Sequence, residues 1–289
     1  MVVALSHWYQ LNARDLPWRR SEFHEEYGAW GVLVSEFMLQ QTPVKRVIPH
    51  LDAWLKRWPT AAALAQASPG EVVHQWASLG YPRRALWLHG AATAIVTEHG
   101  GQTPRDVKAL LALSGIGDYT ARAVAVFAFG DRHPVVDTNT RRVIARYLHG
   151  QAQPGSPSRR DLDDMEQLLP DEPEAAALTN AAMMELGATV CTAQTPKCSV
   201  CPLAADCEWR NAGFPASEDR RRKQAKYEGS DRQTRGAVLR ELRSAPGYTV
   251  AVDEVIATWP DPLQRDRAID SLIVDGLVEA TARMLRLPR

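Results

Sequence analysis

Four cysteines lie close together near residue 200, and their type and spacing suit a metal centre. Cys191, Cys198, Cys201 and Cys207 are the only cysteines among the 289 residues. Zinc sites usually pair their ligands as two close doublets, whereas only the middle two cysteines are closely spaced here. The spacing therefore favours a cubane iron–sulfur cluster held by four thiolates over zinc. Disulfides are disfavoured, because the chain has the features of an intracellular protein.

Two carboxylates occupy positions that suit acid–base chemistry. Glu36 lies in a run from 30 to 39 that is apolar on nearly every face of an expected helix. Burial disfavours the charged form, so we expect a raised pKa and a proton available near neutral pH. A structural ion pair with an arginine is the alternative. Asp137 follows the segment 133–136 and opens another expected helix, where its plainest role is an N-cap.

A glycine pair marks a third candidate site. Gly115 and Gly117 flank one aliphatic residue between two helical patterns. Such glycines permit a tight hairpin whose backbone amides point outward at the start of the second helix and can hold a phosphate. A packing turn between two helices uses glycine too, so the pair alone is a weak signal.

The elements that must position these residues are mostly helices. Apolar residues recur at three- and four-residue spacing in stretches near 29–40, 43–57, 83–98, 105–113, 118–129, 138–148 and 174–188. Between Pro215 and Ser230 this periodicity stops, and a basic run contains Arg220, Arg221, Arg222, Lys223 and Lys226. This change of composition predicts a charged linker.

The tail after the linker has the pattern of a winged helix. Apolar residues predict helices near 238–242, 252–256 and 268–273, followed by two short apolar runs that suit a hairpin. A winged helix can place its third helix in a DNA groove, here with Arg265 and Arg267. Many such modules instead bind protein or only pack against their neighbours.

Composition excludes several classes of protein. The hydrophobic fraction of 45% suits a folded chain of about two domains rather than a disordered one. The formal net charge is zero, so any anionic partner must be held by local patches. The first residues lack the pattern of a secretion signal, and no apolar run is long enough to cross a bilayer. We therefore expect a cytoplasmic, bacterial-type protein with no membrane partner.

Several motifs resemble the helix-hairpin-helix DNA glycosylases and, within them, the MutY-type adenine glycosylases. They are LPWRR at 16–20, SEFMLQQT at 35–42, WASLGY at 76–81, LSGIGDYTARAVAVFAFG at 113–130, VVDTNTRRV at 135–143 and ELGATVC at 185–191. The resemblance covers roughly residues 5 to 213 and ends in the four-cysteine loop of the family. It implies a mostly helical fold and one [4Fe-4S] cluster.

The resemblance also implies an organisation into parts. A catalytic region over 1–213 would combine a six-helix barrel near 22–132 with a cluster domain from 1–21 and 133–213. A basic linker over 214–230 and a winged-helix-like domain over 231–289 would follow.

The activity that the resemblance implies is hydrolytic removal of adenine from duplex DNA opposite 8-oxoguanine or guanine. Breaking a purine N-glycosidic bond needs a proton for the departing base and a negative group near the sugar. By similarity Glu36 protonates the adenine and Asp137 stabilises the sugar, with Asn139 and Tyr119 hydrogen-bonding around Asp137. Relatives that cut the strand carry a lysine near Tyr119, so we expect a monofunctional glycosylase. Packing against the hairpin is the plain role of this tyrosine.

Contacts with DNA follow from the same resemblance. Gln41 and Tyr81 correspond to residues that wedge into the duplex when the adenine is extruded, and Thr42 and Leu79 would line the opposite base. Arg14, Leu16 and Trp18 match the wall of the adenine pocket. Phosphates would be held by Gly115, Gly117 and Lys197.

Two departures from the family pattern bear on the substrate. Nothing in the tail aligns with the larger C-terminal domain that helps the family read 8-oxoguanine, and Ala181 stands where the family often offers Glu or Gln to adenine. A glycosylase for thymine, uracil or a deaminated purine is therefore one alternative. A catalytically silent lesion-binding or redox protein is another. We expect the glycosylase to work as a monomer, as is common among enzymes that wrap a single flipped nucleotide.

Overall fold

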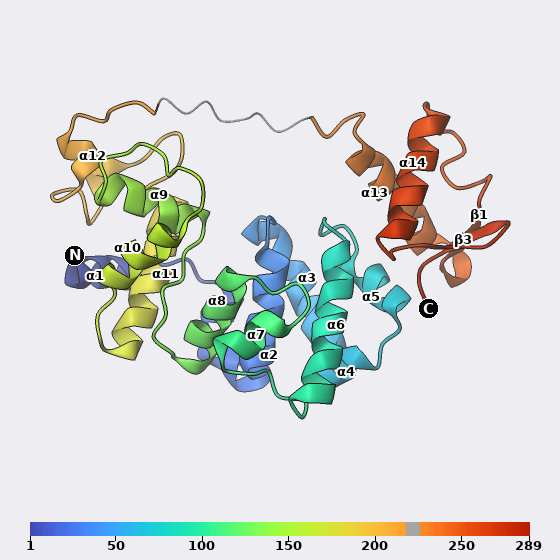
Figure 1. Ribbon diagram of the computed structural model, residues 1–289, viewed down its shortest axis with the longest axis horizontal. Helices are drawn as coiled ribbons and strands as arrows, with labels where there is room; N and C mark the ends of the chain where they lie inside the picture. Colours follow the sequence, from blue (N-terminus) through green and yellow to red (C-terminus); the bar gives the residue numbers. More distant parts are fainter. Residues whose placement is uncertain (218–225) are drawn as a thin grey trace. The chain divides into compact units, whose positions relative to one another are not determined.

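The computed structural model describes residues 1–217 and 226–289, and Figure 1 shows a protein built mostly of helices. It forms two compact units. The first comprises residues 1–25, 105–110 and 117–222, and the second comprises residues 26–104, 111–116 and 223–289. Most of the predicted basic run, from Arg220 to Lys223, lies outside the described residues. The division into barrel, cluster domain, linker and tail stays a prediction.

The predicted helical stretches are confirmed with shifts of a few residues at their ends. The α-helices are α1 (Val2–Asn12), α2 (Ser21–Leu39), α3 (Val44–Arg57), α4 (Ala61–Ala65), α5 (Pro69–Trp76), α6 (Arg83–Glu98), α7 (Val107–Ala112), α8 (Asp118–Phe129), α9 (Thr138–Tyr147), α10 (Arg159–Leu168), α11 (Pro173–Thr189), α12 (Glu208–Asn211), α13 (Asp231–Ser244) and α14 (Pro262–Val274). Short 3-10 turns are η1 (Pro17–Arg19), η2 (Cys198–Val200) and η3 (Pro246–Tyr248). No helix in the described ranges has the length and apolar character that a membrane crossing demands.

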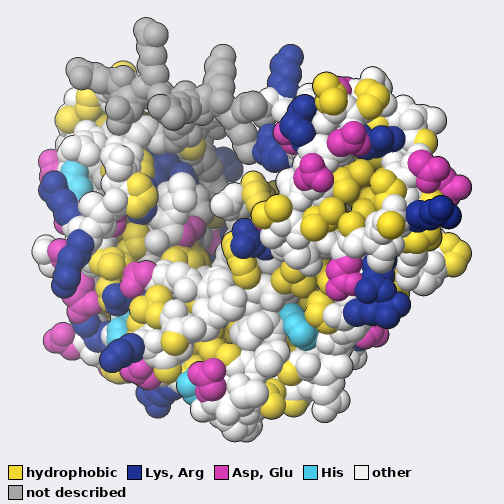
Figure 2. Space-filling view, turned by 45° about the vertical axis from the view of Figure 1, so that its right-hand side comes forward, with side chains coloured by type: hydrophobic (Ala, Val, Ile, Leu, Met, Phe, Trp, Pro, Cys, Tyr) yellow, Lys and Arg dark blue, Asp and Glu magenta, His cyan; other side chains and the backbone are white. Residues whose placement is uncertain are grey.

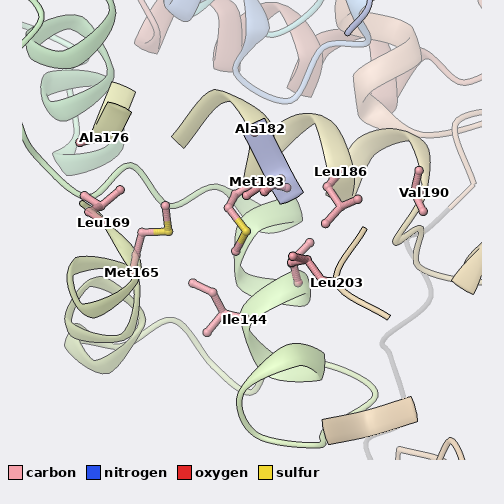
Figure 3. Close-up of a cluster of buried hydrophobic side chains, with 11 residues drawn as sticks. Ile144, Met165, Leu169, Ala176, Ala182, Met183, Leu186, Val190 and Leu203 are labelled. Carbon is pink, nitrogen blue, oxygen red and sulfur yellow. The ribbon is translucent and has the colours of Figure 1, made fainter. Parts of the chain in front are cut away.

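The core of the first unit forms where α9, α10 and α11 bury their apolar faces together (Figure 3). Residues at three- and four-residue spacing on α11 are buried, as the sequence periodicity predicts. The labelled members of this core are Ile144, Met165, Leu169, Ala176, Ala182, Met183, Leu186, Val190 and Leu203. Val190 and Leu203 lie within or beside the cysteine loop, so this core also supports that loop.

The helical part of the second unit is held by large aromatic side chains. Trp54 on α3 meets Trp58 and Trp76 edge to face, with ring centroids 4.7 and 5.4 Å away. Such pairs stabilise a core beyond the area that they bury. The last part of α2 is apolar all round and buried, which agrees with the run read from the sequence. This helix bends at Gly28, whose φ is 51°.

The tail forms a small module of α13, α14 and a three-stranded antiparallel sheet. The strands β1 (Thr249–Ala251), β2 (Glu279–Ala280) and β3 (Met284–Arg286) lie in the order β1-β3-β2, with Val250 opposite Leu285. The helix predicted near 252–256 is wrong: this segment is a series of turns. Ile256 has a φ of 42°, which breaks any helix, and β-branched residues dominate the segment.

The module packs against α5 rather than standing alone. Val73 on α5 belongs to the same buried cluster as Val238, Leu272 and Leu285 of the module. A Cβ at Gly70 would collide with the carbonyl of Pro288, so the two backbones approach as closely as glycine allows. The C-terminal module is therefore part of the second unit.

Candidate functional site

The four cysteines line one small pocket in the first unit. The other lining residues are mostly apolar, with Arg146 and Arg210 as the charged exceptions. Within the described residues, no three His, Cys, Asp or Glu side chains are arranged to hold a single metal ion. Sulfurs that share a pocket without converging on one point suit a cluster of several atoms better than zinc.

Two of the thiols in this pocket, those of Cys198 and Cys201, are poorly placed to ionise on their own. Burial and the neighbouring cysteines raise the pKa of Cys198, and burial raises the pKa of Cys201 to about 11. A cationic iron core would supply the positive charge that four thiolates require. The residues present therefore fit an iron–sulfur cluster.

A buried arginine on α9 anchors the cysteine loop. Arg146 is 2% exposed, and its guanidinium donates to the carbonyls of Ala152, Thr192 and Ala193 at 3.0, 2.8 and 3.3 Å. It also donates to the Cys191 sulfur at 3.3 Å and stacks 4.5 Å above the ring of Trp209. This cation lies where thiolate charge would gather, and no local sequence pattern marks it.

Asp137 begins α9, as predicted, and both of its carboxylate oxygens are engaged. Oδ1 accepts from the backbone N–H of Thr140 at 2.7 Å, and Oδ2 accepts from Asn139 Nδ2 at 2.8 Å. The predicted contact between Asn139 and Asp137 is thus present. The positive end of the α9 dipole also stabilises the carboxylate charge. The side chain of Asp137 is therefore held in one orientation by these two hydrogen bonds.

Hydrogen bonds connect Asp137 to the cysteine loop. Arg142, 6% exposed, donates to Asn139 Oδ1 at 2.9 Å, to the carbonyl of Gly187 at 2.6 Å and to the carbonyl of Cys191 at 2.8 Å. A Cβ at Gly187 would lie 2.7 Å from the Asn139 carbonyl oxygen, so α11 can approach α9 here only with glycine. Arg142 therefore fixes the orientation of the Asn139 side chain through its Oδ1. No local sequence pattern marks this role either.

Glu36 lies on the buried half of α2 in the second unit. Glu36 is 4% exposed. Its neighbours along the helix, Val32, Leu33 and Phe37, are buried even more deeply. The apolar surroundings that the sequence predicted are therefore present.

The two residues predicted to wedge into DNA stand on unusual backbone. Gln41 and Tyr81 have φ values of 55° and 48°, in the left-handed region that side-chain-bearing residues rarely adopt. Both are exposed, Tyr81 by 45%. Strained backbone of this kind persists only where neighbours over-determine it, and it gathers at functional sites.

Arg84 on α6 contacts both of the segments that carry these residues, the one before Gln41 and the one before Tyr81. Its buried guanidinium donates to the carbonyls of Phe37, Met38 and Gln40 at the end of α2, and to Gly80 in the other loop. It also donates to Thr42 Oγ1 at 2.8 Å. Burial lowers its pKa to about 10, but the group remains charged at neutral pH. Thr42 and Leu79 are buried, at 8% and 1% exposure.

The residues predicted to wall the adenine pocket belong to the first unit. Arg14 Nε and Nη2 donate to Glu185 Oε1 and Oε2 at 2.7 and 2.9 Å, and Arg19 Nη2 donates to Oε2 at 2.9 Å. Leu16 is buried, and Trp18 lies in η1 with its carbonyl 3.0 Å from His24 Nε2. Their contact with adenine, and any effect of Ala181, stay predictions.

The buried Glu185 ion pair predicts a pH-dependent stability. Burial raises the pKa of Glu185, but the hydrogen bonds and charges of Arg14 and Arg19 outweigh this and lower it below its usual range. Its stabilisation is therefore complete above the unfolded pKa, about 4.3, and is lost as the pH falls through the lower folded pKa. We expect Glu185→Gln to cost about 2 to 4 kcal/mol at pH 7, since one partner is buried.

The measurement is thermal unfolding of both proteins at pH 7 and near pH 4. The Tm gap is expected to begin narrowing near pH 4, just below the unfolded pKa, and to keep narrowing as the pH is lowered further toward the folded pKa of Glu185. Glu98→Gln, at an exposed position of α6, is the matched control and should leave Tm nearly unchanged. A gap of equal size at both pH values would exclude the ionic explanation.

The glycine hairpin precedes α8, and its two glycines differ in what they permit. Gly115 has a φ of 75°, and a Cβ there would lie 2.7 Å from Trp87 Cβ. Gly117, the N-cap of α8, has a φ of −100°, and a Cβ there would meet nothing within 4 Å. Gly115 is therefore needed by the fold, whereas Gly117 is not.

This difference gives a test of the phosphate site. We expect Gly117→Ala to leave Tm within a few degrees but to weaken duplex binding about tenfold, because its methyl group would stand between the amides and a phosphate. Gly115→Ala should instead lower Tm, since it adds strain and a clash. Binding is measured by fluorescence anisotropy with a labelled duplex. Unchanged affinity of Gly117→Ala would contradict a phosphate at this helix start.

Tyr119 and Lys197 occupy different settings. Tyr119, in the first turn of α8, packs against the apolar cluster that contains Ala123, Val126 and Val135. The structure thus contains the packing contact that the sequence predicted for Tyr119, and its role in the reaction stays a prediction. Lys197 is exposed in the cysteine loop, next to Cys198. Its contact with phosphate stays a prediction.

Two segments of the chain match known protein families. Residues 34–164 match the HhH-GPD superfamily of base excision DNA repair proteins, and residues 191–207 match the iron-sulfur binding domain of endonuclease III. The second match begins and ends at cysteines of the loop. It confirms the [4Fe-4S] cluster predicted from their spacing.

Individual proteins are similar over almost the whole chain. The chain is 54% identical over 280 residues to the adenine DNA glycosylase of Mycolicibacterium smegmatis, which covers 97% of this chain and 93% of that protein. It is 50% identical over 275 residues to the adenine DNA glycosylase of Mycobacterium tuberculosis, with 95% and 88% covered. Among solved structures, a thermostable thymine-DNA glycosylase is similar with a TM-score of 0.65 and 26% identity, over 73% of this chain and 95% of that one.

Proposed function

The chain belongs to the adenine DNA glycosylases of the HhH-GPD base excision repair superfamily, and we propose that it releases adenine mispaired with 8-oxoguanine or guanine by hydrolysis alone. Its cluster-bearing loop holds an iron–sulfur centre. In this proposal the cluster fixes the loop that carries Lys197 and takes no part in bond cleavage.

The observation that carries the proposal is the setting of Glu36. Among the described residues the buried carboxylates are Glu36 and Glu185, and Glu185 is neutralised by two arginines. Glu36 is flanked along α2 by the buried apolar residues Leu33 and Phe37, and burial of this kind favours the protonated form of a carboxyl group. A purine leaves more easily when N7 is protonated, so a general acid at this position suits adenine.

Asp137 and Asn139 are proposed to stabilise the positive charge that develops on the sugar. As the base departs, the sugar gains positive charge, and an anion fixed at a helix start stabilises that charge without having to reorganise. The hydrogen bond from Asn139 to Asp137 Oδ2 aims the carboxylate. Water then completes the hydrolysis.

The absence of strand cleavage is proposed from Tyr119. A glycosylase that cuts the strand uses an amine to form a Schiff base with the sugar, and a phenol cannot form one. Tyr119 occupies the first turn of α8, near the point where the family resemblance implies a lysine in relatives that cut the strand.

A panel of labelled duplexes tests the proposal. Adenine opposite 8-oxoguanine or guanine should be released, and adenine opposite thymine should not. The strand should break only after alkali treatment. Breakage before alkali would contradict a monofunctional enzyme, and equal rates on all three duplexes would contradict mismatch specificity.

A second candidate activity is removal of thymine or uracil from mismatches with guanine. It is favoured by the similarity in fold to the thermostable thymine-DNA glycosylase. The same panel, extended by T:G and U:G duplexes, distinguishes the two. Release of thymine faster than adenine would replace the first proposal by the second.

A further inference from the structure

A groove in the second unit runs between the C-terminal module and the loops that carry Gln41 and Tyr81. It has a volume of about 960 Å³, at the upper end of the range of roughly 300–1,000 Å³ typical of ligand pockets. One wall is formed by α13, and the other by residues of α3, α6 and the loop before α6. A groove of this size has room for a stretch of nucleic-acid backbone.

The charges along this groove are almost all positive. Its described lining contains seven arginines and one carboxylate, Asp275. On the α13 side these are Arg232, Arg235, Arg240 and Arg243, spaced by three, five and three residues, so they follow one face of the helix. Because the net charge of the protein is zero, this face is a local concentration of charge. Figure 2 shows how basic and acidic side chains elsewhere on the visible surface are interspersed.

The arginines along α13 differ in how far they are exposed to solvent. Arg235 donates to Ser271 Oγ at 2.5 Å and to Asp275 at 2.6 Å, and burial lowers the pKa of Arg243 to about 10. By contrast, Arg232 and Arg240 are exposed, and Arg240 has no carboxylate partner in the described residues. The guanidinium groups of these two residues are therefore accessible to an anion in solution.

The helix expected to read DNA in a winged helix is a poorer candidate. On α14, Arg265 pairs with Asp266 at 3.0 Å, and Arg267 lies 3.7 Å from Asp231. Neither arginine lines the groove. Their charge is therefore partly neutralised within the module.

We propose that α13 binds the phosphates of the DNA strand opposite the target adenine, so that the C-terminal module is a second DNA-binding surface. This rests on the proposed function, because Gln41 and Tyr81, which would enter the duplex beside the opposite base, line the same groove. Phosphates are the ligands that a row of exposed arginines prefers, and they need no base-specific contacts. The groove thus holds the partner strand while the wedge residues fill the gap left by the adenine.

The test compares two double variants of the holoenzyme. Arg232→Gln with Arg240→Gln removes two charges from the groove, and Arg265→Gln with Arg267→Gln removes two from α14 as a matched control. The probe is a labelled duplex with an uncleavable tetrahydrofuran site opposite 8-oxoguanine. Since each phosphate contact contributes about 0.9 to the slope of log affinity against log salt, the groove variant should lose about 2 from that slope. The control should keep the wild-type slope.

Neutral methylphosphonates then identify the strand. Placed beside 8-oxoguanine, they should weaken wild-type binding and leave the groove variant nearly unaffected; placed on the other strand, they should weaken both. The proposal would be overturned if the groove variant kept the wild-type salt slope, or if both variants lost the same amount of slope. It would also be overturned if only methylphosphonates on the other strand weakened binding. Because the tetrahydrofuran duplex has no base to release, the binding result can be interpreted even if the protein proves unable to release adenine.

Discussion

Replacing Glu36 by glutamine is expected to abolish adenine release while the protein still folds and binds duplex DNA. Glutamine has nearly the same shape but carries no acidic proton, so the leaving base would depart unprotonated. General acid catalysis contributes roughly 10² to 10⁴ in rate, and we expect a loss within this range. Single-turnover excision from an A:8-oxoguanine duplex measures the effect.

The control for this prediction is again Glu98→Gln, which makes the same chemical change at an exposed position. It should keep the wild-type excision rate. Duplex affinity of Glu36→Gln, measured on the tetrahydrofuran duplex, should remain within a few fold of wild type. Retention of more than a tenth of the wild-type rate would remove Glu36 from its proposed role as the acid.

The features that sequence predicted well are those that depend on neighbours along the chain. Helical periodicity located α3, α6, α8 and α11 because one face of each helix is buried. The N-cap role of Asp137 was equally local, since its partner Thr140 is three residues away. Cysteine spacing indicated the cluster for the same reason.

The features that sequence missed depend on contacts between distant residues. Arg84 binds carbonyls more than forty positions away, and Arg142 does the same with Gly187 and Cys191. Glu185 meets Arg14 from 171 positions away. A buried charge looks like any surface charge in a sequence until its partner is known, so no local pattern marked these residues. In the tail, β2 and β3 form the hairpin that the two short apolar runs predicted, whereas β1, three residues long, left no alternating pattern.

Replacing Arg142 by methionine is expected to slow base release by roughly 10- to 100-fold, the effect typical of removing a residue that orients a reacting group. Methionine fills similar space but donates no hydrogen bonds, so Asn139 would lose the partner at 2.9 Å that holds its amide toward Asp137. The Cys191 carbonyl would lose its donor as well. We therefore expect lower iron content together with slower excision.

Arg142→Lys separates these two consequences. A lysine keeps the charge but has one nitrogen, which cannot reach Asn139, Gly187 and Cys191 together. If Arg142 positions the catalytic carboxylate, Arg142→Lys should retain most of its iron and still excise adenine slowly at saturating DNA. Arg141→Gln is the matched control, because Arg141 is the next residue of α9 but donates to Gly155 instead. Normal excision by an iron-replete Arg142→Lys protein would mean that Arg142 supports only the loop, and that Asp137 and Asn139 keep their geometry without it.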